Sequence, residues 1–289
     1  MNKRYMVIVA DDFGRSPSIN RAIAEAHDRG IVTAASMIAG EEAFSEAVHI
    51  ALARSRLSVG LHVTLCDGRS VLPHTQIPDL TDADGFFEAS PAKAGLKYMR
   101  PGLRSQIEME IEAQFVRLEN AGIRPTHVDS HHHLHMHPVI FVILCRLASQ
   151  RGIGWVRLPR EPLQAILKVR STSRGIMPFF EWAVFRALGT YNMRLARAYG
   201  LRAACAVYGP ARTGNIDENS LIDMVNNARG RVAEVFAHPD TATVEGRQEL
   251  EALTSCRVRE RAAGLGAAFV GYRELSGAAA NSACAEEKR

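Results

Sequence analysis

The sequence predicts an α/β fold whose parallel sheet closes into a distorted (β/α) barrel, similar to a TIM barrel. Short apolar runs such as residues 5–10 alternate along the chain with segments of helical periodicity such as 103–122, and this alternation is typical of parallel sheets. Roughly six to eight such units favour a barrel over a doubly wound open sheet, which is the alternative. The 289 residues suit one barrel domain.

Most expected helices have recognisable ends. The helix over 16–30 starts with Ser16 before Pro17, an N-cap followed by proline in the first turn, and Gly30 ends it. The strands expected in chain order are 5–10, 31–39, 57–65, 126–130, 153–158, 231–240 and 267–275. The helices expected are 16–30, 41–55, 103–122, 138–152, 179–200 and 216–228.

Two long segments interrupt this pattern. Residues 66–100 are rich in proline and glycine, and a loop of that length usually has a function, such as shaping the mouth of a site. Residues 159–230 are the least regular part of the chain. We expect a single domain over 1–275 with long loops over its site, followed by a disordered tail over 276–289.

Composition and charge narrow the class of protein. With 47% hydrophobic and 23% charged residues the chain resembles ordinary globular proteins, and its net charge of +4 is too small to indicate nucleic-acid binding. The five cysteines show no paired spacing, so we expect reduced thiols and a cytoplasmic location. Asp11 interrupts the first apolar run too early for a signal peptide. We expect a soluble protein, at most peripheral at the inner membrane, as a monomer or a homo-oligomer.

Polar side chains gather where the expected strands end. The carboxyl ends of parallel strands meet at one face of a barrel, where such enzymes place their active sites. Six of the eleven histidines fall within residues 127–137, which is the strongest signal in the sequence. In chain order the polar residues are Asp11, Asp12, His62, the histidines of THVDSHHHLHMH (126–137), Arg157, Arg160 and His238.

This histidine cluster beside a pair of aspartates indicates a metal site. Imidazole and carboxylate are usual ligands of divalent cations, and three protein ligands leave a position for a reactive water. A single histidine would more often be a core hydrogen-bonding residue. In an extended HHHLH segment alternate histidines face the same way, so not all of the histidines can bind one ion. One carboxylate of Asp11 and Asp12 can bind the ion while the other accepts a proton. The alternative for the pair, an Asx turn that caps the next helix, is disfavoured because Ser16 already fills that role.

At these residues the sequence resembles the YdjC-like family of carbohydrate deacetylases, which includes chitooligosaccharide deacetylases. The matching motifs span nearly the whole chain, and the first and fourth are highly specific. They are ADDFG (10–14), GIVTAAS (30–36), GLH (60–62), THVDSHHHLHMHP (126–138), HP (238–239) and GYREL (271–275). Two further segments, VRLPREP (156–162) and LTSCRVR (253–259), resemble the branch associated with hopanoid biosynthesis. That branch is linked to deacetylation of a glucosamine-bearing hopanoid lipid.

The resemblance implies a hydrolase that removes the N-acetyl group from an N-acetylglucosamine-bearing substrate. It implies one divalent ion, zinc or magnesium, held by Asp12, His62 and His131, with Asp11 as general base and His238 as general acid. Two imidazoles and one carboxylate favour zinc on ligand chemistry. The expected binding partner is therefore a sugar or glycolipid substrate, and we expect no nucleic-acid partner.

Four further residues are expected to bind substrate or orient other groups. His133 and His135 either orient ligands or contact the substrate. Arg157 or Arg160 holds Asp11 ionised through a charge-assisted hydrogen bond, unless both are plain surface arginines.

An aromatic segment followed by arginines, residues 177–201, indicates contact with a lipid tail or a membrane surface. Its candidate lipid-contact residues are Phe179 and Trp182, although these aromatic rings could equally pack on the barrel. Three other functions stay open on the sequence: deacetylation of soluble chitooligosaccharides, metal-dependent phosphoesterase activity, which usually needs more carboxylates, and a non-catalytic metal or lipid carrier.

Overall fold

The computed structural model describes residues 4–167 and 177–278, apart from the side chains of 166–167, 177–182 and 277–278. Its centre is a seven-stranded parallel sheet in the order β4-β3-β2-β1-β6-β5, with β7 also paired to β1. The strands are β1 (Arg4–Phe13), β2 (Ala34–Met37), β3 (Ser58–Val63), β4 (Val128–Ser130), β5 (Ala206–Tyr208), β6 (Val232–Ala237) and β7 (Ala267–Phe269). The predicted α/β fold with a distorted barrel is confirmed.

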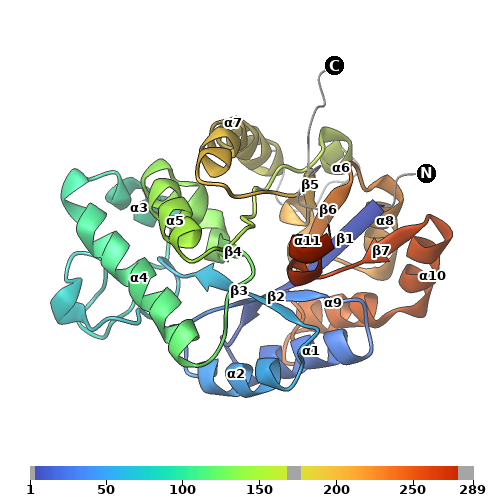
Figure 1. Ribbon diagram of the computed structural model, residues 1–289, viewed down its shortest axis with the longest axis horizontal. Helices are drawn as coiled ribbons and strands as arrows, with labels where there is room; N and C mark the ends of the chain where they lie inside the picture. The colour runs from blue at the N-terminus through green and yellow to red at the C-terminus, as the bar shows by residue number, and fades with distance from the viewer. Residues whose placement is uncertain (1–3, 168–176, 279–289) are drawn as a thin grey trace.

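Helices surround this curved sheet, with α4 and α5 beside β3 and β4, and α1, α2 and α9 along another side (Figure 1). They are α1 (Pro17–Asp28), α2 (Phe44–Leu52), α3 (Pro91–Tyr98), α4 (Arg104–Asn120), α5 (Pro138–Gln150), α6 (Leu163–Leu167), α7 (Met177–Ala198), α8 (Glu218–Asn227), α9 (Val244–Thr254), α10 (Cys256–Gly264) and α11 (Tyr272–Ala278). In the described part of the chain, none of these helices has the length and apolarity needed to cross a bilayer.

The first strand is the axis of the fold because it pairs with three neighbours. Residues 5–10 of β1 pair with β6, residues 4–6 also pair with β7, and the carboxyl half pairs with β2. The side chains of residues 6–10 are fully buried, which explains the continuous apolar run that is typical of a strand covered on both faces. The next helix starts as expected, since the Ser16 hydroxyl accepts a hydrogen bond from the Ile19 N–H.

The barrel is distorted where the sheet runs from β4 toward β5. Residues 153–158, expected to be a strand, form only two isolated parallel bridges, Val128 with Val156 and Trp155 with Arg202. A short strand, β5, lies instead within residues 159–230, where no strand was expected. The expected strand over 267–275 ends after β7, and the chain then turns into α11, which includes the first residues of the expected tail. Residues 279–289 lie outside the described residues.

Two other expectations need correction. The excursion over 66–100 is not structureless, because it contains α3, whose start is capped by Ser90. Cys66, Cys145 and Cys256 are free as expected, but Cys205 is disulfide-bonded, so the expectation of five reduced thiols is wrong at this position.

Close packing beneath the site depends on Gly60 in β3. A Cβ atom at this position would lie 2.5 Å from the His127 imidazole, which is 1% exposed and hydrogen-bonded to Ser36. The glycine therefore lets the β4 segment approach β3 closely.

We expect Gly60→Ala to lower the free energy of unfolding by about 1–3 kcal/mol, because the added methyl group must displace a packed ring. Denaturant unfolding measures this change. Gly264→Ala is the matched control, since no atom lies within 4 Å of a Cβ at this helical position and alanine stabilises helices by about 0.5–1 kcal/mol relative to glycine. Equal stability of the two variants would contradict the expectation.

Candidate active site

Asp11 and Asp12 both face one cavity because β1 is irregular where it ends. The register of β1 against β2 shifts between Ala10 and Phe13, and Asp12 has a φ of 63°, in the left-handed region. Such a bulge re-aims side chains that a regular strand would send to opposite faces. The doubled aspartate thus acts as a pair at the cost of one strained residue, typically about 1–3 kcal/mol.

A buried arginine lies behind this pair. The guanidinium of Arg157 donates to both carboxylate oxygens of Asp11, at 2.6 and 2.9 Å, and lies 2.9 Å from Asp129. Its Nε donates to Glu234 in β6, and the side chain is 1% exposed. Burial alone would raise the pKa of Asp129, but the charge of Arg157 holds it well below its usual range. Three strands are thereby joined through one cation.

Asp12, His62 and His131 converge as a candidate metal site. One ligand atom from each lies within 4.8 Å of the others, and all three residues are buried. Asp12 Oδ1 lies 2.9 Å from His131 Nδ1 and 3.5 Å from His62 Nε2, yet this buried oxygen has no well-oriented hydrogen bond. Burial would raise the pKa of Asp12, but His131 and the other imidazoles lower it well below its usual range. An anionic oxygen facing two imidazole nitrogens fits a divalent cation.

The orientation of His62 is fixed from behind. Its Nδ1 donates to Asp129 Oδ1 at 2.7 Å, and the other oxygen of Asp129 accepts the Ser36 hydroxyl. The second ring nitrogen, Nε2, is turned toward Asp12, and in the neutral ring it carries the lone pair. A carboxylate in this position fixes the tautomer of a metal-binding histidine.

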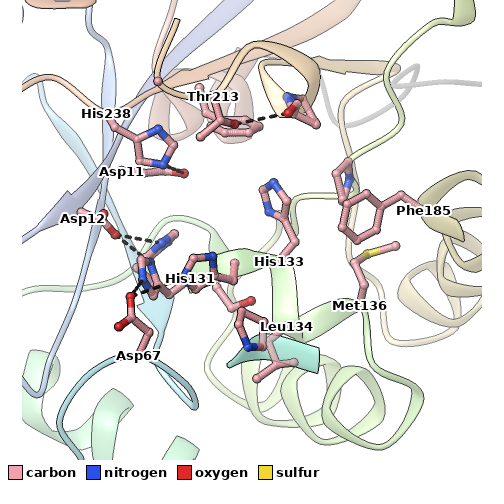
Figure 2. A pocket seen from close by; sticks show the side chains of 18 of the residues that line it. Asp11, Asp12, Asp67, His131, His133, Leu134, Met136, Phe185, Thr213 and His238 are labelled. Atoms are coloured by element: carbon pink, nitrogen blue, oxygen red, sulfur yellow. Dashed lines mark hydrogen bonds and ion pairs between the residues drawn. The ribbon is translucent and has the colours of Figure 1, made fainter. Parts of the chain in front are cut away.

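His238 lies on the opposite side of Asp11 from the metal-ligand cluster (Figure 2). Its Nε2 is 3.9 Å from Asp11 Oδ2, and its side chain is 29% exposed. The backbone N–H of His238 donates to Glu249 at 2.5 Å, and this buried carboxylate also accepts the Gly214 N–H. The structure thus brings together all five residues that the sequence proposed as ligands, base and acid.

The remaining candidates divide into two groups. His133 lines the cavity, with edge contacts to Phe185 and Phe236 at centroid distances of 5.6 and 5.1 Å. His135 does not line it: the residue is fully buried, its Nε2 donates to the Arg157 carbonyl at 2.8 Å, and its Nδ1 accepts from the Ser130 hydroxyl. Its role is therefore structural.

Of the two candidate arginines, only one contacts Asp11. Arg157 binds Asp11. The side chain of Arg160 packs against Gly189 of α7 instead. Phe179 and Trp182 belong to the backbone of α7, but their side chains lie outside the described residues.

Sequence reasoning missed several charged residues of the site. Arg15 and Asp67 line the cavity beside His131, and Glu234 anchors Arg157. A signal for Glu234 existed, because a charged residue in the centre of a buried strand such as VAEVFA is rarely without a partner. Nothing in the local sequence around Asp67 pointed to His131.

The cavity has a volume of about 1090 Å³ and two different walls. Asp11, Asp12, Asp67, His131 and His238 lie on one side, Phe185 and Met136 lie on the other, and His133 lies between the two groups (Figure 2). Val184 and Leu188 of α7 extend the apolar wall. This space can hold a ligand larger than one sugar ring, with a polar end at the candidate metal site.

Sequence comparison identifies the family. Residues 5–264 match the YdjC-like protein family. The chain belongs to the YdjC-like family. A relative from Geobacillus stearothermophilus, named a carbohydrate deacetylase, is 31% identical over 283 residues that cover 94% of this chain and 98% of that protein. A second carbohydrate deacetylase, from Brevibacillus brevis, is 39% identical over 154 residues that cover 53% of this chain and 59% of that protein.

Solved structures share the fold of this YdjC-like chain. A protein from Enterococcus faecalis, described as a cellobiose-phosphate cleavage protein, superposes with a TM-score of 0.74 at 23% identity and covers 94% of this chain and 99% of its own. An uncharacterized protein from Agrobacterium tumefaciens superposes with a TM-score of 0.51 at 14% identity, covering 95% and 90%. At these identities the likeness concerns the fold alone.

We expect His135→Asn to destabilise the protein in a pH-dependent way. Burial lowers the pKa of His135 to about 4, from about 6.5 in an unfolded chain. Wild-type stability from this residue is therefore complete above pH 6.5 and is lost as pH falls toward 4, because the unfolded histidine takes up a proton first.

The unfolding free energy of the variant should be lower by about 1–3 kcal/mol at pH 7.5, since two buried hydrogen bonds are lost. This difference should shrink between pH 6.5 and 4, as measured by denaturant unfolding at several pH values. A difference that stays constant with pH would contradict the structural role of His135.

Proposed function

We propose that this YdjC-like protein is a metal-dependent carbohydrate N-deacetylase. The observation that carries the proposal is the convergence of Asp12, His62 and His131 on one point, with Asp11 and His238 beside it. The relatives named carbohydrate deacetylases support it, one of them over almost the full length of both chains. The reaction is hydrolysis of an acetamide to acetate and a free sugar amine.

Asp12, His62 and His131 would hold the ion, and two imidazoles with one carboxylate favour zinc over magnesium. When bound, such an ion polarises the acetamide carbonyl and lowers the pKa of the attacking water. The deep carboxylate of Asp129 keeps the His62 ring in the orientation that this site needs.

Asp11 is the proposed general base. Both of its oxygens accept from Arg157, so the carboxylate is held in one orientation, and its Oδ2 faces His238. It accepts the proton of the attacking water, while protonated His238 donates from Nε2 to the departing amine. Proton transfer of this kind typically contributes about 10²–10⁴-fold at each step.

The proposed substrate is an N-acetylglucosamine unit linked to a polycyclic terpenoid lipid, as the resemblance to the hopanoid-associated branch implies. The apolar wall of Val184, Phe185 and Leu188 supports an apolar group next to the sugar. Val184 and Tyr191 of α7 are 39% and 57% exposed, which suits peripheral contact with the inner membrane from the cytoplasm. Soluble chitooligosaccharides are the alternative substrate.

Substitutions in the site separate ligands from proton-transfer groups. We expect Asp12→Ala and His131→Ala to lose both bound metal and acetate release from N-acetylglucosaminides. Asp11→Asn and His238→Ala should keep the metal and lose about 10²–10⁴-fold in kcat. Metal content by elemental analysis and acetate by enzymatic assay measure these effects.

Wild-type turnover in Asp12→Ala with normal metal content would overturn the ligand assignment, and loss of metal in His238→Ala would make this residue a ligand. Two ions per chain together with release of phosphate from phosphate esters, and no acetate, would favour the phosphoesterase instead.

The apolar wall gives a prediction about the aglycone. We expect Phe185→Ser to raise KM about tenfold for a glycoside with a terpenoid tail, because loss of one apolar contact surface weakens binding by this order. The KM for a soluble chitooligosaccharide should stay unchanged. Val116→Ser in α4 is the matched control, since this exposed apolar residue does not line the cavity. Equal effects on both substrates would exclude a lipid-binding wall.

A further inference from the structure

We propose that Asp67 positions His131 for metal binding by accepting its Nε2–H, and that Arg15 holds the opposite tautomer of His131 when the ion is absent. The inference rests on the proposed metal site. It concerns a loop aspartate and an arginine that neither the motifs nor the comparisons assign to any role.

The two ring nitrogens of His131 face different partners. Nδ1 lies 2.9 Å from Asp12 Oδ1, whereas Nε2 lies 2.6 Å from Arg15 Nη1 and 3.3 Å from Asp67 Oδ2. A neutral imidazole has one N–H and one lone pair, so Nε2 can accept from Arg15 or donate to Asp67, but it cannot do both. The tautomer of His131 therefore decides which of the two is its partner.

The distances describe the first arrangement. An arginine N–H always donates, so the short contact with Arg15 uses the lone pair of Nε2. The proton of the neutral ring then lies on Nδ1, which is 2.9 Å from Asp12 Oδ1 but not aligned with it for a hydrogen bond. In this tautomer Nδ1 has no lone pair for a cation shared with Asp12 and His62.

The second arrangement requires Asp67. If Nδ1 is to bind the ion, its proton must be on Nε2, and Asp67 is the acceptor within reach. Arg15 need not leave the site, because its Nη2 already donates to the same Asp67 oxygen at 3.0 Å. His132 Nε2 lies 3.4 Å from this oxygen as well, so the carboxylate is held from several sides.

A comparison with the other imidazole ligand shows what is particular to His131. His62 Nδ1 has the buried Asp129 as its acceptor at 2.7 Å, so the tautomer needed for metal binding is already present. His131 has a donor and an acceptor competing at the same nitrogen. Only one of the two histidines is therefore ready for the ion before it arrives.

The backbone supports a specific role for Asp67. This residue has a φ of 47°, which a non-glycine residue rarely adopts, and its N–H donates to the Glu88 carbonyl at 3.1 Å. Figure 2 shows its carboxylate directed from the loop after β3 toward His131. Strained residues of this kind persist where the surrounding structure holds them, commonly at functional sites.

Zinc affinity of the purified protein, measured by competition with a chromogenic chelator, tests the role of Asp67. We expect Asp67→Ala to bind zinc about 10–100-fold more weakly, the usual effect of removing the carboxylate behind a histidine ligand. Asp67→Asn, whose carbonyl can still accept the Nε2–H, should lie between the alanine variant and the wild type. Asp84→Ala is the matched control, because it removes the same charge from an exposed position of the same excursion outside the cavity lining.

The outcomes separate this inference from the proposed function. If the wild type binds no divalent ion, the metal site itself fails. If the wild type binds zinc and Asp67→Ala binds it equally well, only the role of Asp67 is overturned. A loss of affinity shared by Asp84→Ala would reduce the effect to net charge and also overturn it.

Histidine tautomers are visible directly by ¹⁵N NMR of labelled protein, with the signals of His131 assigned through His131→Gln. We expect Nδ1–H in the metal-free protein and Nε2–H after addition of zinc. Arg15→Met removes the donor at Nε2 and should raise the Nε2–H fraction before zinc is added. The same tautomer with and without zinc would contradict the exchange.

Discussion

The buried guanidinium of Arg157 is the interaction on which the rest of the site depends. It gathers Asp11, Asp129 and Glu234 from three strands, and its positive charge offsets the cost of burying these carboxylates. Removing one partner of such a buried ion pair typically costs about 3–5 kcal/mol, because the other charge stays behind uncompensated. The strands β1, β4 and β6 are therefore joined electrostatically as well as by the sheet, and Asp11 is placed as a consequence.

The side chains of the site are held less firmly with increasing distance from Arg157. Asp129 links Arg157 to His62, so this candidate metal ligand has one fully buried partner and one orientation. The other candidate ligand, His131, lies nearer the surface and is contacted by Arg15 and Asp67, whose side chains are 31% and 39% exposed. The inner half of the site is thus preorganised, and the outer half keeps two hydrogen-bonding arrangements close in geometry.

The sequence predicted those parts of the site that short motifs at strand ends encode. Asp11 and Asp12 end a buried strand, and the histidine cluster follows another, so their convergence followed from parallel topology alone. It could not predict how the histidines divide, because His132 and His133 both adopt a positive φ, and the segment turns where extended alternation was assumed. The partners of Arg157 lie 146 and 77 residues away from it, at Asp11 and Glu234, and no local pattern encodes such separations. The strand expected over 153–158 is also absent, because strand propensity does not decide whether neighbouring segments pair along their length. These residues make only isolated bridges.

The spacing of the proposed base and acid also bears on how the site returns to its starting state. The proposed mechanism starts with an anionic Asp11 and a protonated His238, and it ends with the proton of the water on Asp11 and the proton of His238 on the amine. Both states have the same total charge, and Asp11 Oδ2 lies 3.9 Å from His238 Nε2. One proton that crosses this gap, directly or through a single water, restores the starting pair without exchange with bulk solvent. Arg157 favours this direction of transfer, because its two hydrogen bonds to Asp11 stabilise the anionic carboxylate.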